Sequence, residues 1–375
     1  MSAGHSHDGT GHGRVQLHAQ ERSGDPTRTK TVRRTYGQRL RGAFARINTA
    51  IREGVVENDV LALSDAGLQA DVGLTAEVDL PPDLSTFDEG ERIRRFEDWL
   101  DEAMESEVLD VIDRDGNRFI DHAYERALKD ADVNLERAGI AVNDAPAVEA
   151  ALQVPVHERK LQALFARNYA ELDGITDEVA RQVTRELADG MSEGVNPREM
   201  ARRITDRVDK IGKTRATTLA RTEVINAYSE GTLTRFEELD VEEVVIRAEI
   251  STAGDGRVCP VCQALEGQTQ EDTLTIEGVR EETFRFDPSD ADIVDSLRGQ
   301  YRKKPPIHPQ CRCVILPVGS ATAGAAYRER PEAYLSLFAA GAFRGRVDPG
   351  QLVDADDDDV HELVARHGSG QPVAG

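Results

Sequence analysis

The sequence predicts an α+β protein that is mainly α-helical, with a small two-strand Cys/His unit near the C-terminal end. Three observations support this fold class. Apolar residues recur at spacings of three and four before position 240, which is typical of helices that bury one face. From Val241 to Ile250 the pattern changes to alternation, which is typical of a strand. All four cysteines lie after that change.

The composition limits the class of protein. A chain of 375 residues can form two or three domains. It has no run near the roughly 18 apolar residues that a membrane span needs, so we expect a protein made in a cytoplasm, without membrane contact. The formal net charge is −23, with seven lysines against thirty-nine arginines. This is typical of halophilic proteins, because molar salt screens self-repulsion. A GC-rich genome that encodes an ordinary acidic protein is the alternative.

The N-terminal region is basic, unlike the rest of the chain. Residues 1–35 are predicted to be a disordered arm that contains histidine and arginine. A helix should follow, because five apolar residues recur at helical spacing: Tyr36, Leu40, Phe44, Ile47 and Ile51. Basic residues around it form a predicted partner-contact surface: Arg33, Arg34, Arg39, Arg41 and Arg46. A helix that packs its stripe and solvates its arginines is the alternative. The partner of this surface could be an acidic protein or packaged DNA. High salt weakens DNA binding, so an acidic protein is the preferred partner.

The chain before the strand divides into helical regions. We predict a helical N-terminal region over 36–150, with a linker near 65–90, and a helical core over 155–240. Within the core, Thr176 and Asn196 are expected to cap two helices. A long helix should begin near residue 214. Three polar residues share one of its faces and are expected in solvent: Glu223, Asn226 and Glu230.

The cysteines form two close clusters, and a histidine accompanies the second. The residues are Cys259, Cys262, His308, Cys311 and Cys313. Zinc takes thiolate and imidazole ligands tetrahedrally, and a C-x2-C pair is a common half-site. If Cys311 and Cys313 lie on a strand from Cys311 to Leu316, both side chains point to one face and can reach the same ion. Residues 241–318 are therefore predicted to be a β-containing, zinc-type unit.

Other chemistries for these cysteines remain open. Disulfides between the clusters are geometrically possible, and so are free thiols. A catalytic zinc would need an open position and a general base, for which Asp255, Glu266 and Asp287 are candidates by their position in the sequence. A structural zinc is the preferred interpretation, because the cluster offers enough protein ligands to close the site. The long interval between the clusters is expected to form a surface loop.

Three motifs in order resemble the phage head morphogenesis family, the phage Mu protein F-like minor head proteins. They are Leu219 to Glu223, Asp255 to Gly267 and Pro305 to Cys313. Outside the ligands, the matching positions include Arg221, Thr222, Glu223, Asp255, Arg257 and Gly267. The resemblance covers about 160 to 318 and, together with the composition, implies a tailed virus of halophilic archaea. Residues 319–375 form an acidic C-terminal tail without a counterpart in the family.

The resemblance implies a structural minor capsid protein rather than an enzyme. It would act in head assembly at or near the portal, with a role in DNA packaging or ejection also open. Its expected partners are the portal protein and the major capsid protein, with packaged DNA as a further partner of the basic helix. Its expected location is the virion, in the head interior or at the portal vertex. The alternatives are a zinc-dependent enzyme, either a nuclease or a toxin-like transferase, and a general nucleic-acid-binding protein.

Overall fold

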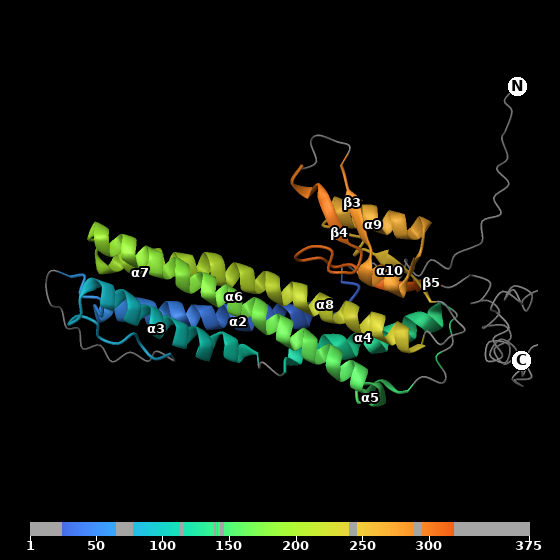
Figure 1. The fold of residues 1–375 in the computed structure, drawn as a ribbon, viewed down its shortest axis with the longest axis horizontal. Coiled ribbons are helices and arrows are strands. Elements are labelled where there is room, and N and C mark those ends of the chain that lie inside the picture. Colours follow the sequence, from blue (N-terminus) through green and yellow to red (C-terminus); the bar gives the residue numbers. More distant parts are fainter. Residues whose placement is uncertain are drawn as a thin grey trace, which may run out of the picture. The chain divides into compact units, whose positions relative to one another are not determined.

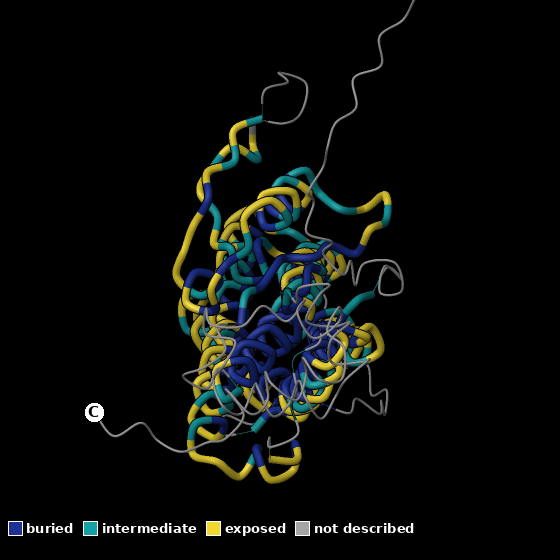
Figure 2. Tube along the Cα trace, turned by 90° about the vertical axis from the view of Figure 1, so that its right-hand side faces the viewer, coloured by how far each residue is buried: buried dark blue, intermediate teal, exposed yellow. Residues whose placement is uncertain are grey.

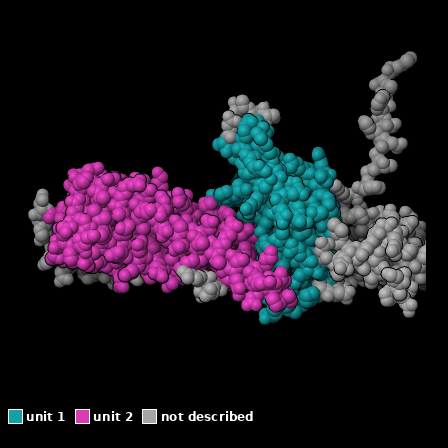
Figure 3. Space-filling view, in the orientation of Figure 1, with its two compact units in different colours: residues 1–27, 124–153, 228–375 teal, residues 28–123, 154–227 magenta. Residues whose placement is uncertain are grey.

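The structure is a computed structural model that describes residues 25–64, 78–112, 116–138, 140, 142, 146–239, 246–288 and 295–318. The chain divides into two compact units (Figure 3). Unit 1 contains residues 1–27, 124–153 and 228–375, and unit 2 contains residues 28–123 and 154–227. The predicted fold class is confirmed, since helices dominate and the strands are few, short and antiparallel. Within the described ranges, no helix is both long and apolar enough to cross a membrane.

Unit 2 is built from helices. Its elements are α2 (Lys30–Arg52), η1 (Glu53–Glu57), α3 (Glu89–Glu107), η2 (Leu109–Val111), α6 (Pro155–Glu193), α7 (Pro197–Arg207) and η3 (Val208–Lys213), with the first parts of α4 (Arg118–Arg137) and α8 (Thr214–Leu239). The later parts of α4 and α8 belong to unit 1. Buried positions recur along the helices at the spacing of an amphipathic face. Figure 2 colours these buried positions dark blue.

Helix α2 confirms the predicted apolar stripe. All five of its members have no exposed surface: Tyr36, Leu40, Phe44, Ile47 and Ile51. The Tyr36 ring stacks on Phe119 at 4.6 Å between centroids, and its hydroxyl oxygen accepts a 2.8 Å hydrogen bond from Asn168. The boundary of the predicted arm at residue 35 is wrong, because α2 begins at Lys30. The rest of the arm lies outside the described residues, except for residues 25–29.

Two predicted helix starts had different outcomes. Asn196 caps α7, since its side chain accepts a 3.0 Å hydrogen bond from the backbone N–H of Glu199. The predicted start at Thr176 is wrong, because α6 is one helix from Pro155 to Glu193. The Thr176 hydroxyl donates to the carbonyl of Asp173 at 2.7 Å, so it is satisfied inside the helix. Gly194 ends α6 in the left-handed conformation, at φ 67°.

The predicted linker near 65–90 ends where α3 begins. Asp88 caps this helix by accepting a 3.0 Å hydrogen bond from the backbone of Glu91. Residues 65–77 of the linker lie outside the described residues. The described part is not merely a solvated connection, since Leu84 is 1% exposed and its N–H donates to the carbonyl of Val60 at 2.8 Å.

Unit 1 combines two small sheets with helices. Its further elements are α5 (Val148–Ala151), β1 (Arg247–Ser251), α9 (Pro260–Glu271), β2 (Leu274–Thr275), α10 (Ile276–Glu281), β3 (Thr283–Phe286), η4 (Asp295–Leu297), β4 (Gly299–Arg302) and β5 (Val314–Val318). One antiparallel sheet has the order β2-β1-β5. A second sheet pairs β3 with β4, and both of its strands are labelled in Figure 1. The region between the cysteine clusters is therefore not one surface loop, and the predicted count of two strands is too low. Its strands of two to four residues are too short to show a period in the sequence.

The polar face predicted for α8 is not in solvent. Glu223 is 2% exposed, Asn226 5% and Glu230 6%, so the solvated interpretation is wrong. Arg235 on the same helix is 1% exposed and forms a bidentate pair with Asp132 of α4, at 2.6 and 2.9 Å. Residues 223–236 of the helix are all buried, and ion pairs or hydrogen bonds hold the side chains of Glu223, Glu230 and Arg235.

Candidate metal centre

The pairing of β1 with β5 brings the two cysteine clusters together. In the antiparallel register Ser251, the last residue of β1, lies opposite Val314, the first residue of β5. The segment that leaves β1 leads to Cys259, and the segment that enters β5 carries Cys311 and Cys313. Two parts of the chain that are far apart in sequence therefore meet at one end of the sheet. Cys311 and Cys313 precede β5, so the prediction that they lie on the strand is wrong.

The five predicted ligands form two overlapping groups of neighbouring side chains. Nε2 of His308 is 3.0 Å from the Cys259 sulfur and 3.1 Å from the Cys262 sulfur. The sulfurs of Cys262 and Cys311 are 3.9 Å apart. Two groups have all their ligand atoms within 4.8 Å, one with Cys259, Cys262 and His308 and one with Cys262, Cys311 and Cys313. Cys262 belongs to both groups and is the centre of the cluster.

The donor set is compatible with a zinc ion, and so is the spacing of one sulfur pair. Zinc–sulfur bonds of about 2.3 Å at tetrahedral angles place two sulfurs about 3.8 Å apart, close to the observed Cys262–Cys311 distance. Four thiols and an imidazole are soft and borderline ligands of the kind that select zinc. A closed site needs four ligands and the cluster offers five, so one of the five would lie outside the first shell of a single ion.

The surroundings of the cluster support a structural site. Cys262, Cys311 and Cys313 are 2 to 3% exposed and belong to the same apolar core as Leu265 and Ile315. Helix α9 begins at this point. The Cys259 sulfur occupies its N-cap and accepts a 3.4 Å hydrogen bond from the backbone N–H of Cys262. At the second cluster a sulfur also accepts from the backbone, since the N–H of Cys313, two residues on, lies 3.4 Å from the Cys311 sulfur.

Hydrogen bonding prepares His308 and Cys259 as ligands. Nδ1 of His308 is 2.8 Å from the carbonyl oxygen of Pro309, which can only accept, so Nδ1 carries a proton and Nε2 faces the sulfurs. Hydrogen bonds from Cys262 and His308 lower the pKa of the Cys259 thiol to about 4. The hydrogen bond to the Cys259 sulfur raises the pKa of His308 to about 9. A metal ion would bind the Cys259 thiolate and displace the proton from Nε2.

No disulfide links the four cysteines, all of which lie in the described part of the chain. The 3.9 Å between the Cys262 and Cys311 sulfurs is nearly twice the length of an S–S bond, which is about 2.05 Å. The four sulfurs are unbridged, and only unbridged cysteines can provide the thiolates that bind a metal ion.

The carboxylates considered as general bases are engaged elsewhere. The Glu266 carboxylate accepts hydrogen bonds from the backbone N–H and the hydroxyl of Thr252, at 3.0 and 2.9 Å. Asp287 forms an ion pair with Arg298. Asp255 pairs with two arginines, and these hold the pKa of its carboxyl far below the usual range, Arg312 contributing first and Arg257 second. Strong pairing of this kind opposes the proton uptake that a general base needs.

The other motif residues fall in two places. Asp255 and Arg257 lie in the turn before Cys259, while Gly267 is an exposed residue of α9 with nothing within 4 Å of an added Cβ, so the structure gives no reason for glycine there. The Arg221 to Glu223 triplet belongs to α8 within unit 2. There Arg221 is exposed, and the Thr222 hydroxyl donates to the carbonyl of Thr218. These three residues are not ligands of the cluster.

Glu223 is the buried member of that triplet. Its Oε1 lies 3.3 Å from Nη2 of Arg167, and its Oε2 accepts a weak 3.4 Å hydrogen bond from Asn226. Burial raises the pKa of its carboxyl, while the charge of Arg167 opposes that shift. Glu223 therefore acts within the helical unit, as part of the polar interior of α8.

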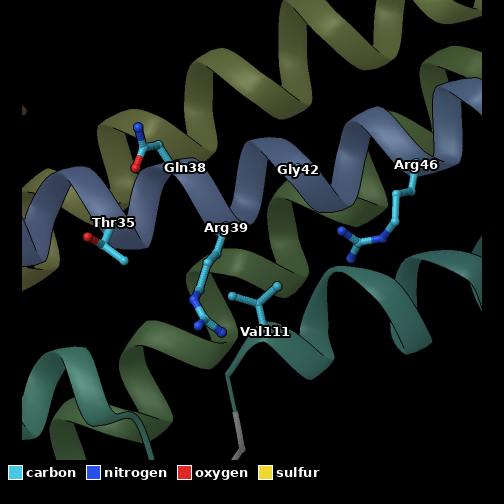
Figure 4. A pocket seen from close by; sticks show the side chains of 6 residues that line it. All are labelled: Thr35, Gln38, Arg39, Gly42, Arg46 and Val111. Carbon is cyan, nitrogen blue, oxygen red and sulfur yellow. The ribbon is translucent and has the colours of Figure 1, made fainter.

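The predicted contact surface on α2 is present in part. Arg34, Arg39 and Arg41 are exposed, Arg33 is 7% exposed, and Arg46 pairs with Glu107 at 2.6 Å. A shallow groove of about 370 Å³ opens beside the helix (Figure 4). Its lining consists of Thr35, Gln38, Arg39, Gly42, Arg46 and Val111. Arg33 is buried and Arg46 is partly buried in an ion pair, so three arginines of the predicted surface are exposed: Arg34, Arg39 and Arg41.

Comparison with known families gives one match. Residues 181–316 match the family model described as Phage Mu protein F like protein. The Phage Mu F-like segment runs from within α6 to β5 and contains all five predicted ligands and the Arg221 to Glu223 triplet. It therefore includes parts of both units. The resemblance read from the motifs is supported over this range. Comparison with curated proteins and with solved structures finds no significant match.

Proposed function

We propose that the chain is a minor head protein of a tailed virus, with a structural role in head morphogenesis at or near the portal. The observation that carries the proposal is the convergence of four thiols and one imidazole inside the Phage Mu F-like segment. The acidic, lysine-poor composition extends the proposal to a virus of halophilic archaea, assembled in the host cytoplasm and carrying the protein in its head.

Zinc is the proposed ion, and its role is to hold the fold of unit 1. The residues that would hold it are Cys262, Cys259 and three from the second segment, with one of the five outside the first shell. Bound zinc would supply stabilisation by linking the segment after β1 to the segment before β5. Five candidate ligands for four positions leave no place for a reactive water, which favours a structural role over a zinc nuclease or transferase.

The exposed arginines of α2 are the proposed contact with a partner. The preferred partner is an acidic surface of the portal protein or the major capsid protein, because contacts with DNA phosphates weaken steeply in high salt. Arg34, Arg39 and Arg41 bring three positive charges to the exposed surface of α2, in a chain with a net charge of −23. Packaged DNA is the other candidate partner, and binding experiments can distinguish it from a protein.

Mass spectrometry of purified virions and assembly intermediates tests the assignment. We expect the chain in particles or in proheads, and its absence from both would overturn the structural role. A second experiment replaces Arg34, Arg39 and Arg41 with glutamate. The matched control has the same charge change at three exposed arginines on other helices, namely Arg185, Arg198 and Arg215. Only the α2 variant should lose incorporation into particles. DNA binding that weakens steeply with salt and is lost in the α2 variant would assign the surface to DNA instead.

A further inference from the structure

An ion pair joins the two segments that carry the candidate ligands. Arg312, which stands between Cys311 and Cys313, directs two guanidinium nitrogens at the two carboxylate oxygens of Asp255, at 2.7 and 2.6 Å. This is the bidentate arrangement in which an arginine fixes both the distance and the orientation of a carboxylate. The two side chains are 18% and 27% exposed, so solvent screens the pair only in part.

The position of Asp255 makes this pair a link across the site. Its carbonyl accepts a 3.1 Å hydrogen bond from Val258, which forms the turn that leads directly into Cys259. On the other side, the N–H of Cys311 donates to the carbonyl of His308 at 3.1 Å and forms a second turn. Each turn presents one half of the ligand set. The β1–β5 ladder ends at Ser251 and Val314, so it covers neither turn.

We propose that Asp255 and Arg312 form a clamp that positions the Cys311–Cys313 turn against Cys259 and Cys262 before any ion binds. The effect of the clamp on zinc affinity rests on the proposed metal centre. The ion pair itself forms without a metal ion. Asp255 and Arg312 are positioning residues, since neither supplies a thiol or an imidazole to the cluster. A preformed arrangement of ligands lowers the ordering cost that metal binding would otherwise meet.

Arg257 provides a control that distinguishes loss of the link between the two segments from loss of a positive charge near Asp255. Its Nη2 pairs with the same Asp255 oxygen at 2.8 Å, but Arg257 lies two residues from Asp255 and is 78% exposed. It therefore touches the same carboxylate without reaching the second segment. Removing Arg257 changes the net charge by the same amount as removing Arg312 and leaves the cross-link intact.

The experiment measures zinc affinity of the full chain by competition with a chromophoric chelator. We expect Asp255→Asn and Arg312→Gln to weaken binding by about 10- to 100-fold, the usual effect of losing a group that supports metal ligands. Arg257→Gln should stay within about twofold of the unchanged chain, since an exposed ion pair contributes little. The double variant with Asp255→Arg and Arg312→Asp should recover part of the affinity, because it restores a pair across the two segments.

A metal-free readout distinguishes failure of the clamp from failure of the metal centre. In chelator-treated protein, Asp255→Asn and Arg312→Gln should raise the rate at which the buried thiols react with a thiol reagent, while Arg257→Gln should not. If the unchanged chain binds no zinc, the metal centre is wrong, and the thiol rates alone then decide the clamp. If zinc binds and all three single variants match the unchanged chain in both readouts, the clamp is wrong. Single variants that lose affinity without recovery in the double variant would indicate local disruption and also overturn it.

Discussion

Glu230 of α8 bridges two cations that come from elsewhere in unit 1. Its Oε1 accepts a 2.6 Å hydrogen bond from Arg280 of α10, and its Oε2 pairs with Lys304, which follows β4. Glu237 also pairs with Arg280, at 2.6 Å. The Glu230 side chain is 8% exposed and that of Glu237 is 41% exposed, so the two carboxylates share a cation and differ in burial. Replacing Glu230 or Glu237 by glutamine therefore compares the loss of a buried carboxylate with the loss of an exposed one.

We expect Glu230→Gln to lower the free energy of unfolding by about 2–3 kcal/mol. Removing one member of a buried ion pair costs about 3–5 kcal/mol, because the remaining charge loses its partner in a poorly solvated place. The expected cost is smaller here, because the side chains of Arg280 and Lys304 are 18% and 20% exposed and can recover some hydration. Glu237→Gln should cost about 0–1 kcal/mol, the usual value of an exposed pair.

Hydrogen exchange read by mass spectrometry is the appropriate assay, because the chain has two units and a single unfolding transition is not assured. Glu230→Gln should accelerate exchange in peptides that cover α10 and residues 299–307, and urea unfolding followed by circular dichroism should give the free-energy change. Equal losses of stability in the two variants, or a larger loss in Glu237→Gln, would contradict a dominant effect of burial.

Two further predictions concern packing and pH. Gly231→Ala should lower the stability of the fold by about 1–3 kcal/mol in thermal melts, because the new Cβ would lie 2.8 Å from the carbonyl oxygen of Tyr124. Gly174→Ala is the control. It has nothing within 4 Å of the new Cβ and should raise the stability by up to about 1 kcal/mol. Burial raises the pKa of Tyr36 to about 12 from 10.0, so its contribution to stability is full below pH 10 and is lost as the pH rises towards 12. Tyr36→Phe should flatten the fall in stability over that window, measured by urea unfolding at each pH, and an unchanged slope would contradict the assignment.

The local features of the sequence predicted the local features of the fold. The stripe from Tyr36 to Ile51 repeats at helical spacing, and all its members are buried. Asn196 and Glu199 carry the cap of α7 within four consecutive residues. Both predictions depend only on neighbours along the chain, where steric and hydrogen-bonding rules act directly. The cysteine clusters were found in the same way, because short spacing between thiols is itself a signal.

Features made by distant residues left no comparable signal. Arg312 has no local signal of its role beyond its position between two cysteines, because its partner Asp255 is 57 positions away. The sequence near Glu230 predicts a solvent-exposed side chain, because its partners Arg280 and Lys304 are distant in the sequence. Thr176 was read as a cap because threonine serves both at helix starts and, by bonding back to a carbonyl, in helix interiors.

The metal content of the full chain tests the central claim most directly. The protein would be purified under reducing conditions without added metal, then measured by elemental analysis and by intact mass in native and denaturing solvents. We predict one zinc per chain in the native state and the mass of a fully reduced polypeptide after denaturation, with the zinc lost in Cys262→Ser, since Cys262 belongs to both ligand groups. A metal-free chain whose denatured mass is lower by four protons would contradict the account and assign the four cysteines to disulfides.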